Sequence, residues 1–384
     1  MTLVGASVCV QDLAGAAKGH EAVHAEDLLL RDYQPRSALV TAQHTVSRPR
    51  FAAIDAHNHL GPVWGGGWAD RPLSELLDAM DQAGVQAVVD LDGGWSEEIL
   101  DRHLDHFKEA APERFFHFGG VDWSRWADER NAFADRAARR LREQVRRGAQ
   151  GLKVWKGFGL QVRDPEGHLA TVDDPRLDAI WETAAELGIP VLIHVADPVA
   201  FFAPLDRFNE RWEELHAQPE WHFPSPPYPA FQAVVEALAR LVLRHPQTSF
   251  IGAHVGCYAE NLAWVGEWLD RAPNLYVDIA ARIGELGRQP YAARRFFLRY
   301  ADRVLFGTDV GVDPAWYRIY YRFLETADEY FGYDPGPVPG QGRWSIYGLF
   351  LPDDVLEKVY RLNALRLLGQ PRARGRAAGL PGGS

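Results

Sequence analysis

Histidine and aspartate residues at the ends of short apolar segments are the residues in this sequence best suited to chemistry. His57 and His59 end the segment FAAIDAHNH with one residue between them, and His194 lies at the end of IPVLIHV. His254 and Asp309 lie at the ends of SFIGAHVG and VLFGTDVG. Imidazole and carboxylate groups suit a divalent transition metal such as zinc, and these segments contain no cysteine. The repetition at four segment ends predicts a metal site without thiolate ligands.

The first of these segments explains how two histidines can act together. Side chains alternate along a strand, so we expect Asp55, His57 and His59 on one face and Ile54 and Ala56 on the other. In a closed barrel, the inward face near the carboxyl end of a strand lines the mouth, where two imidazoles can hold one ion. For Asp55, two roles stay open: a contact that supports a metal ligand, and a buried cap or ion-pair partner.

The elements that position these residues follow a regular alternation. Helix-like segments, such as 72–84 and 175–188, separate most of the expected strands, and each strand is an almost continuous apolar run. This pattern predicts an α/β fold, a (β/α)₈ TIM barrel with long loops at its C-terminal face. An open doubly wound sheet is the alternative, but no strand precedes a dinucleotide-binding glycine fingerprint. The expected strands lie at 51–59, 85–93, 114–123, 149–157, 189–197, 249–256, 274–281 and 304–311.

The domain organisation follows from the same pattern. We expect an N-terminal extension at 1–48, the barrel at 49–370, and a disordered tail rich in arginine, glycine and proline at 371–384. Two insertions, 198–229 and 317–351, leave the carboxyl ends of the fifth and eighth strands, where barrels build active sites. Their aromatic residues, and Trp64 after the first strand, predict an enclosed, partly apolar pocket for a ring-bearing or other medium-sized organic substrate.

Composition limits the partners of the protein. The chain has 384 residues, 47% of them hydrophobic, and a formal net charge of −11, which disfavours nucleic acid. No run of eighteen apolar residues and no signal peptide is recognisable, so we expect no membrane partner. The two cysteines, Cys9 and Cys257, are far apart in sequence, which fits a reducing cytoplasm, although one intramolecular disulfide stays open. A small-molecule substrate is expected, and a homo-oligomer stays open.

The motifs DAHNH, LIHV, GAHVG and FGTDV, in this order, resemble the amidohydrolase superfamily, specifically its amidohydrolase-related branch of metal-dependent hydrolases and decarboxylases. The resemblance covers residues 50–370 and includes Asn363, in a helix that closes the barrel in similar proteins. It implies one divalent metal ion, for which we expect zinc. The ligands that it implies are His57, His59, His194 and Asp309, with His254 as the proton-transfer residue.

Other residues have roles that the sequence leaves open. Asp309 can bind the metal, accept a proton from the bound water, or do both at different steps. Some relatives carry a carboxylated lysine at the end of the fourth strand that bridges two metals, and Lys153 is similarly placed. We prefer one metal, with Lys153 and Arg282 as candidates for binding an anionic group of the substrate. An ordinary rim lysine is the alternative for Lys153.

The leading hypothesis for function is a metal-dependent hydrolase that uses metal-activated water on an amide, lactone or related carbonyl. The alternative is non-oxidative decarboxylation of an aromatic or enoic carboxylic acid, with His254 or Asp309 delivering a proton. The complete His-x-His motif matches both reactions. A glutamate at the first histidine, which resembles the pattern of salicylate-type decarboxylases, is absent, and this favours hydrolysis. A third hypothesis is a catalytically silent binding protein.

Overall fold

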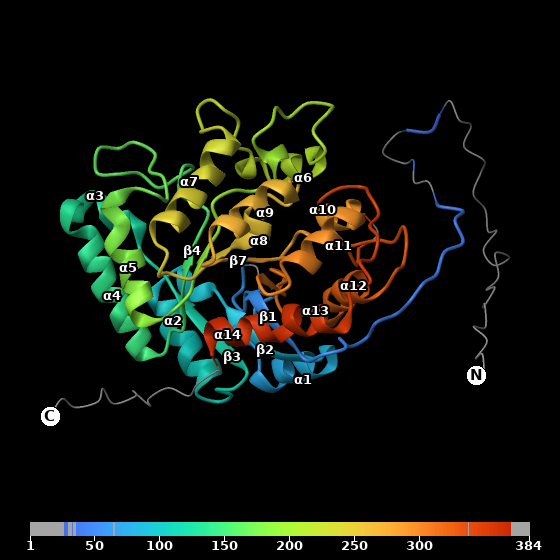
Figure 1. Cartoon of the computed structure of the whole chain (residues 1–384), viewed down its shortest axis with the longest axis horizontal. Helices are drawn as coiled ribbons and strands as arrows, with labels where there is room; N and C mark the ends of the chain where they lie inside the picture. The colour runs from blue at the N-terminus through green and yellow to red at the C-terminus, as the bar shows by residue number, and fades with distance from the viewer. Residues whose placement is uncertain (1–26, 30–32, 34–35, 64–65, 337, 370–384) are drawn as a thin grey trace. The chain divides into compact units, whose positions relative to one another are not determined.

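Eight parallel strands form one sheet, in which every strand pairs with its neighbours in sequence order (Figure 1). Backbone hydrogen bonds bring the two ends of the sheet together: Ala56 donates to the carbonyl of Phe306 at 2.8 Å, and Asp309 donates to the carbonyl of His57 at 2.8 Å. The sheet is therefore a nearly closed barrel, which confirms the (β/α)₈ prediction and excludes the open doubly wound sheet. The strands are β1 Ala53–Asn58, β2 Val85–Asp90, β3 Phe115–Gly119, β4 Gly151–Val154, β5 Val191–Ile193, β6 Phe250–Gly252, β7 Leu275–Asp278 and β8 Val304–Leu305.

The structure, a computed structural model, describes residues 27–29, 33, 36–63, 66–336 and 338–369. The chain divides into two compact units, Met1–Thr41 and Ala42–Ser384, and the second contains the barrel. The expected disordered tail at 371–384 and the candidate residue Trp64 lie outside the described residues. Across the described part of the chain, no helix combines the length and apolar character needed to cross a membrane.

Helices follow the strands around the barrel, and in Figure 1 α4 and α5 lie side by side. The expectation that 317–351 is an insertion outside the alternation is wrong at its start, because α12 packs beside α1. The helices are α1 Leu73–Ala83, α2 Glu97–His103, α3 Trp126–Glu129, α4 Phe133–Arg147, α5 Asp178–Leu187, α6 Trp212–Ala217, α7 Phe231–Arg244, α8 Ala253–Gly256, α9 Leu262–Arg271, α10 Ile283–Arg288, α11 Pro290–Arg299, α12 Pro314–Glu325, α13 Asp353–Glu357 and α14 Asn363–Leu368.

Strand alternation divides the apolar core in two. Residues such as Val88 and Val277 pack with the helices in the larger cluster, whereas Val89 and Ile251 belong to a smaller cluster that includes Ala364 of α14. The smaller cluster fills the barrel interior. Asn363, at the start of α14, is fully buried and donates to the carbonyls of Ala301 (2.8 Å) and Val304 (2.7 Å). The C-terminal helix is thereby fastened across the end of the barrel opposite the strand carboxyl ends.

Candidate metal centre at the barrel mouth

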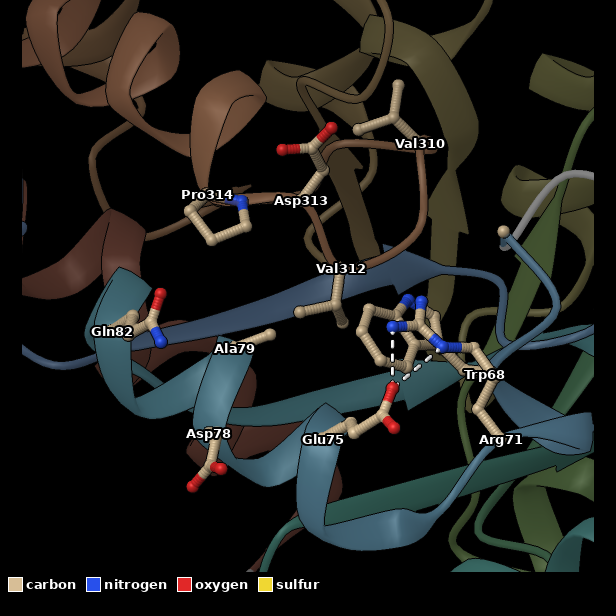
Figure 2. Close-up of a pocket in the computed structure, with 11 residues that line it drawn as sticks. Trp68, Arg71, Glu75, Asp78, Ala79, Gln82, Val310, Val312, Asp313 and Pro314 are labelled. Atoms are coloured by element: carbon tan, nitrogen blue, oxygen red, sulfur yellow. Dashed lines mark hydrogen bonds and ion pairs between the residues drawn. The ribbon is translucent and has the colours of Figure 1, made fainter.

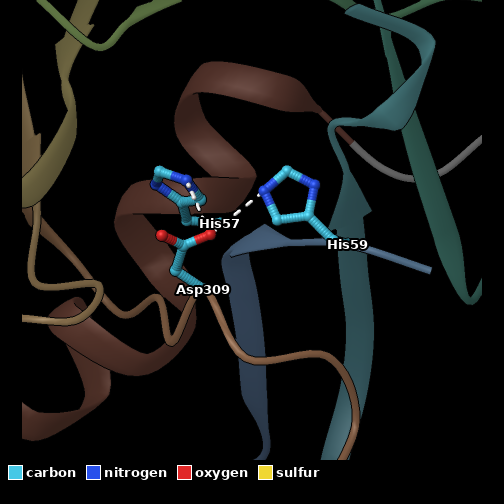
Figure 3. Close-up of side chains that lie close together, drawn as sticks. All are labelled: His57, His59 and Asp309. Carbon is cyan, nitrogen blue, oxygen red and sulfur yellow. Dashed lines mark ion pairs between the residues drawn. The ribbon is translucent and has the colours of Figure 1, made fainter. Parts of the chain in front are cut away.

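Three side chains converge at the carboxyl ends of β1 and β8 (Figure 3). The Nε2 atoms of His57 and His59 lie 3.5 Å and 3.0 Å from Oδ1 of Asp309. One ligand-type atom from each of the three residues lies within 4.8 Å of the other two. Gly307 permits this approach, because a Cβ there would lie 2.9 Å from Cβ of His57. The segment after β8 can therefore pack this closely against His57 only because residue 307 is glycine.

Carboxylates at or just after the ends of two other strands orient both histidines. Nδ1 of His57 lies 2.9 Å from Oδ2 of Asp278, at the end of β7, and Nδ1 of His59 lies 2.7 Å from Oδ1 of Asp92, just after β2. A carboxylate on Nδ1 places the proton there and leaves the Nε2 lone pair free to bind a metal. The Nε2 atoms of both histidines face the carboxylate of Asp309, so three ligand-type atoms converge at one point. The donor set and its geometry fit a divalent transition metal ion.

The electrostatics of the cluster also suit a cation. Burial alone would raise the pKa of Asp309, but the nearby imidazoles of His57 and His59 outweigh burial and hold this pKa well below its usual range. Burial alone would lower the pKa of His59, but hydrogen bonds to Asp309 and Asp92 outweigh it and raise the pKa to about 9. Burial, helped by Lys153, lowers the pKa of His57 well below its usual value. These shifts keep Asp309 ionised and His57 neutral, the charge states in which both side chains can bind a metal ion.

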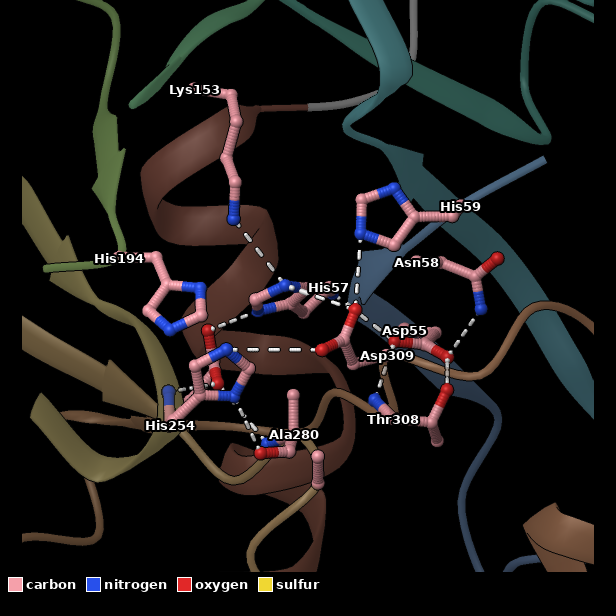
Figure 4. Close-up of polar contacts among 12 residues, drawn as sticks. Asp55, His57, Asn58, His59, Lys153, His194, His254, Ala280, Thr308 and Asp309 are labelled. Carbon is pink, nitrogen blue, oxygen red and sulfur yellow. Dashed lines mark hydrogen bonds and ion pairs between the residues drawn. The ribbon is translucent and has the colours of Figure 1, made fainter. Parts of the chain in front are cut away.

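His254 lies on the other side of Asp309, held by a strained turn (Figure 4). Its Nδ1 lies 2.8 Å from the carbonyl of Ala280, and its backbone N–H donates to Asp278 at 2.9 Å. Residues 254–257 all have positive φ, which is unfavourable for the non-glycine residues among them. The turn aims Nε2 of His254 at Oδ2 of Asp309, 3.8 Å away. Burial, then the neighbouring His194, lowers the pKa of His254 well below its usual value.

His194 lies beside these groups but is not part of the three-residue cluster. Its ring centroid is 4.3 Å from that of His254, and its Nε2 is 3.5 Å from Oδ1 of Asp197. Lys156 pairs with the same aspartate at 2.5 Å. The structure thus brings together four of the five predicted side chains: His57, His59, His254 and Asp309. His194 lies further away, with the ring of His254 beside it. Its role as a metal ligand stays a prediction.

Ile54 and Ala56 belong to the smaller, interior cluster, so Asp55 between them faces away from the interior and not towards the mouth with His57, contrary to the alternation prediction. The register of β1 is irregular between Asp55 and Asn58. Oδ2 of Asp55 accepts hydrogen bonds from Tyr317 (2.8 Å), Thr308 (2.5 Å) and Asn58 (2.9 Å). Its other oxygen accepts the backbone N–H groups of His57 and Thr308, each at 3.1 Å. Asp55 is therefore a buried cap that ties β1 to the segment after β8, and burial raises its pKa to about 6.

Replacing Asp55 by asparagine should lower the free energy of unfolding by about 3 kcal/mol, since the new amide N–H₂ would face donors in place of an acceptor. Tyr317→Phe removes one of the donors and should cost about 1 kcal/mol. Urea unfolding at pH 8, where the Asp55 carboxyl is ionised, measures both changes. Equal unfolding free energies for Asp55→Asn and wild type would show that the cap does not stabilise the barrel.

Lys153 and Trp155, on β4 and just after it, form the wall next to His57 and His59. The Lys153 side chain is 1% exposed, and its Nζ lies 3.4 Å from Nε2 of His57 and 4.7 Å from the centre of the Trp155 ring. Burial lowers the pKa of Lys153 to about 8. Trp155 stacks on His59, with 5.2 Å between ring centres, and Trp95 stacks on Trp155 at 3.7 Å. A buried cation and an aromatic surface therefore adjoin the cluster.

Arg282 is also buried, just before α10, where its guanidinium donates to the carbonyl of Ala281 at 2.9 Å. Its charge is a further reason, after burial and His194, for the low pKa of His254. Arg282 thus lies near the proton-transfer candidate, whereas Lys153 lies near the metal-ligand candidates. The binding roles of both residues stay predictions.

Two cavities open near the mouth. One, of 550 Å³, lies between α1 and the loop after β8 (Figure 2). Trp68, Arg71 and Val310 are among its lining residues, and Arg71 is paired there with Glu75 at 2.8 Å. The other, of 390 Å³, borders Trp95 and the loops after β2 and β3. Both approach the cluster from its rim, through Val310 beside Asp309 and through Trp95 on Trp155.

Sequence reasoning missed Asp92 and Asp278, the two carboxylates that orient the histidines. Both were visible as ligand-type residues at the ends of expected strands, in VQAVVDLDG and NLYVDIAA. The metal-ligand pattern covers the first, fifth, sixth and eighth expected strands, whereas these two carboxylates end the second and seventh. The need of a metal-binding histidine for a hydrogen-bond partner on its other nitrogen is the signal that points to them.

Comparisons with known proteins agree with this barrel. The family model described as amidohydrolase matches residues 54–370. A 2,6-dihydroxybenzoate decarboxylase from Rhizobium is 17% identical, with 83% of this chain and 98% of that chain covered and a TM-score of 0.50. A dihydroxybenzoic acid decarboxylase from Polaromonas sp. JS666, with bound manganese and the inhibitor 2-nitroresorcinol, is 17% identical, with coverage of 84% and 98% and a TM-score of 0.51.

The comparison with curated proteins found no match. At 17% identity, the two solved structures establish a shared barrel fold. The family model extends over nearly all of the barrel, from β1 to α14, and over the three side chains that converge at its mouth. This chain therefore belongs to the amidohydrolase family.

Proposed function

We propose that this protein is a metal-dependent, non-oxidative decarboxylase of an aromatic or enoic carboxylic acid. The observation that carries the proposal is the buried ammonium of Lys153, 3.4 Å from Nε2 of His57 and 4.7 Å from the Trp155 ring. A buried cation needs an anionic partner, and a substrate carboxylate supplies one directly beside the metal ligands. A neutral amide or lactone offers no carboxylate for this ammonium to bind. The two named decarboxylases act on dihydroxybenzoic acids, which agrees with the proposal.

The chain's own residues divide the work of substrate binding. We propose that His57, His59 and Asp309 hold one divalent ion, zinc in our expectation, with His194 as a further ligand. When bound, the ion supplies a Lewis acid that polarises an oxygen atom of the substrate. Lys153 binds the carboxylate, and the face of Trp155 orients an aromatic or conjugated substrate. Arg282 and Trp64 stay proposed substrate contacts.

The proton transfer is assigned to His254 and Asp309. The Nδ1 proton of His254 is engaged with the Ala280 carbonyl, so Nε2 is the atom that gains and loses a proton. His254 is neutral at rest because its pKa is low, so it first takes up a proton at Nε2 and then delivers it to the carbon that carries the carboxylate. The bond from that carbon to the carboxylate then breaks, its electron pair returns to the carbon framework, and CO₂ leaves. Asp309, 3.8 Å from Nε2, passes a proton from solvent back to His254, so no oxidant or reductant is needed.

The products of the reaction test the proposed decarboxylation. Metal-loaded protein should release CO₂ from members of a panel of hydroxybenzoic and enoic acids, one CO₂ for each acid consumed and without oxygen uptake. In D₂O, deuterium should appear at the carbon that lost the carboxylate. Opening of lactones or cyclic amides without any CO₂ release from the panel would contradict decarboxylation and support hydrolysis. Hydrolysis is the second candidate because the matching family is described as amidohydrolase, and because an Asp309 beside a metal site can activate water.

Replacing Lys153 by methionine should raise KM for the carboxylate substrate about 100-fold, since a hydrogen bond to a charged group is worth about 1.5–3 kcal/mol. Lys153 should contact the carboxylate equally in the bound substrate and in the transition state, before CO₂ has left, so kcat should change much less than KM. Lys358→Met is the control, because Lys358 is a partly exposed lysine paired with Asp302 at 3.2 Å and contacts none of the site residues named above. An unchanged KM in Lys153→Met, or an equal rise in Lys358→Met, would contradict the assigned role.

A further inference from the structure

A buried ladder of polar side chains continues behind His59, away from Asp309. Asp92 is its first rung: Oδ1 lies 2.7 Å from Nδ1 of His59, and Oδ2 accepts the backbone N–H groups of Leu60 (2.9 Å) and Gly61 (2.6 Å). Both oxygens of Asp92 are thus engaged with the residues at and just after the His-x-His motif. The position of Asp92 decides where the imidazole of His59 points.

Asp90 is the second rung. Its Oδ1 accepts the backbone N–H of Asp92 at 3.2 Å. Its Oδ2 lies 2.7 Å from Nδ1 of His103 and 2.9 Å from Nδ1 of His117. Asp90 ends β2, His117 lies in β3, and His103 ends α2, so the rung joins three elements. Asp90 and His117 have no exposed surface, and His103 is 2% exposed.

Burying these polar side chains costs free energy, and close packing alone does not explain why they are present. A carboxylate and two imidazoles lie in the interior, where apolar residues of similar size would avoid the loss of hydration. None of the three side chains touches the proposed substrate wall or takes part in the proton transfer. Their hydrogen bonds lead to Asp92, and the two imidazoles also pack against Phe107. Close packing leaves Asp92 little freedom, because a Cβ on Gly61 would lie 2.9 Å from Oδ2 of Asp92.

We infer that Asp90, braced by His103 and His117, is a positioning residue for the metal site: it holds Asp92, and through Asp92 it fixes the orientation and tautomer of His59. The inference rests on the metal site of the proposed function, but not on the reaction catalysed there. Atoms of Asp90, Asp92 and His103 also lie within 4.8 Å of one another, the spacing of a metal site. Every oxygen of the two carboxylates already accepts an N–H or faces an imidazole nitrogen, which favours a hydrogen-bonded brace.

The test uses the whole protein with Co²⁺ as the probe, because its visible spectrum reports the ligand geometry. Asp90→Asn should weaken Co²⁺ binding about tenfold, the lower end of the loss seen when an outer partner of a metal ligand is changed. It should also alter the Co²⁺ absorption spectrum. Asp178→Asn is the matched control: it breaks a comparable pair, in which Nε2 of His245 lies 3.1 Å from Asp178, far along the chain from the ladder. That variant should leave Co²⁺ affinity and spectrum unchanged.

A second pair of variants covers the case in which Asp90→Asn does not fold. His103→Ala removes one donor to Asp90, whereas His103→Asn keeps a side-chain N–H near the place of Nδ1. We expect weaker Co²⁺ binding for His103→Ala and recovery towards wild type for His103→Asn. Wild-type affinity and spectrum in Asp90→Asn or His103→Ala would overturn the inference. So would two Co²⁺ ions per chain, with the second lost in His103→Ala, since that result indicates a second metal site.

These outcomes separate the inference from the proposed function. If wild type binds Co²⁺ and the ladder variants weaken it, the positioning role stands even when no acid in the panel releases CO₂. If CO₂ is released and the ladder variants bind Co²⁺ like wild type, the decarboxylase proposal stands and the positioning role fails.

Discussion

Replacing His57 by alanine should remove the bound metal ion and the activity together. Nε2 of His57 is one of three donor atoms that converge at the mouth, and its orientation is held by Asp278. Loss of an outer partner of a metal ligand weakens metal binding about 10- to 100-fold. Loss of the ligand itself should weaken metal binding more than that. Metal content after dialysis, measured beside turnover of the acid that wild type consumes, checks this expectation.

The control for this variant is His168→Ala, because the side chain of His168 is 80% exposed and contacts none of the candidate ligands. It should retain both metal and turnover. Full activity of His57→Ala after its metal has been stripped would contradict any mechanism built on the metal centre.

Replacing Asp309 by asparagine should reduce kcat by about 10²- to 10⁴-fold, the range that a positioned acid or base contributes. This substitution should change the chemistry of the side chain without moving the backbone. Asp309 has φ of 63°, a left-handed conformation that asparagine tolerates well, so the backbone should stay in place. The amide can still offer an oxygen atom, but it cannot accept the proton that His254 needs to receive in turn. We therefore expect a larger loss in kcat than in metal affinity.

Asp313→Asn is the matched control for Asp309→Asn. Asp313 precedes α12 on the same loop and caps the helix by accepting the N–H of Ala315 at 2.7 Å, a role that asparagine fills equally well. Steady-state rates and metal titrations of both variants separate the roles. An Asp309→Asn enzyme with wild-type kcat would exclude Asp309 from proton transfer.

Much of the fold was readable from the sequence because each strand is a short apolar run with a helix-like segment before the next. All eight expected strands appear in the sheet, in sequence order. The start of α12 was missed because its tyrosines resemble the aromatic insertions nearby. In the structure Tyr317, Tyr320 and Tyr321 are buried, and Tyr321 donates to the carbonyl of Ala83 at 2.9 Å.

The candidate site was partly readable for a similar reason. Ligand-type residues at strand ends meet at the barrel mouth whatever the details of packing, and His57, His59, His254 and Asp309 do so. Strict alternation misplaced Asp55, because the register of β1 is irregular between Asp55 and Asn58. Such an irregularity depends on partners distant in sequence, so no pattern within one strand reveals it.

The hydrogen-bond partners of the metal-ligand candidates could not be predicted from the sequence. Asp92 and Asp278 lie on strands that sequence reasoning had assigned no role, and which imidazole each one orients depends on the order and register of the barrel. The strained turn at His254 is equally hidden, since positive φ at consecutive non-glycine residues runs against local preference. Local sequence rules fail here at the residues that build the site.

The most direct measurement is a crystal structure of the metal-loaded protein with anomalous scattering at the absorption edge of the bound ion. A single peak should lie between β1 and β8, within about 2.0–2.2 Å of Nε2 of His57, Nε2 of His59 and a carboxylate oxygen of Asp309. Other groups of side chains offer alternatives, including His57 with His254 and Asp278, and Asp90 with Asp92 and His103. A peak at one of these, or none at the mouth of a catalytically active protein, would contradict the metal centre described above.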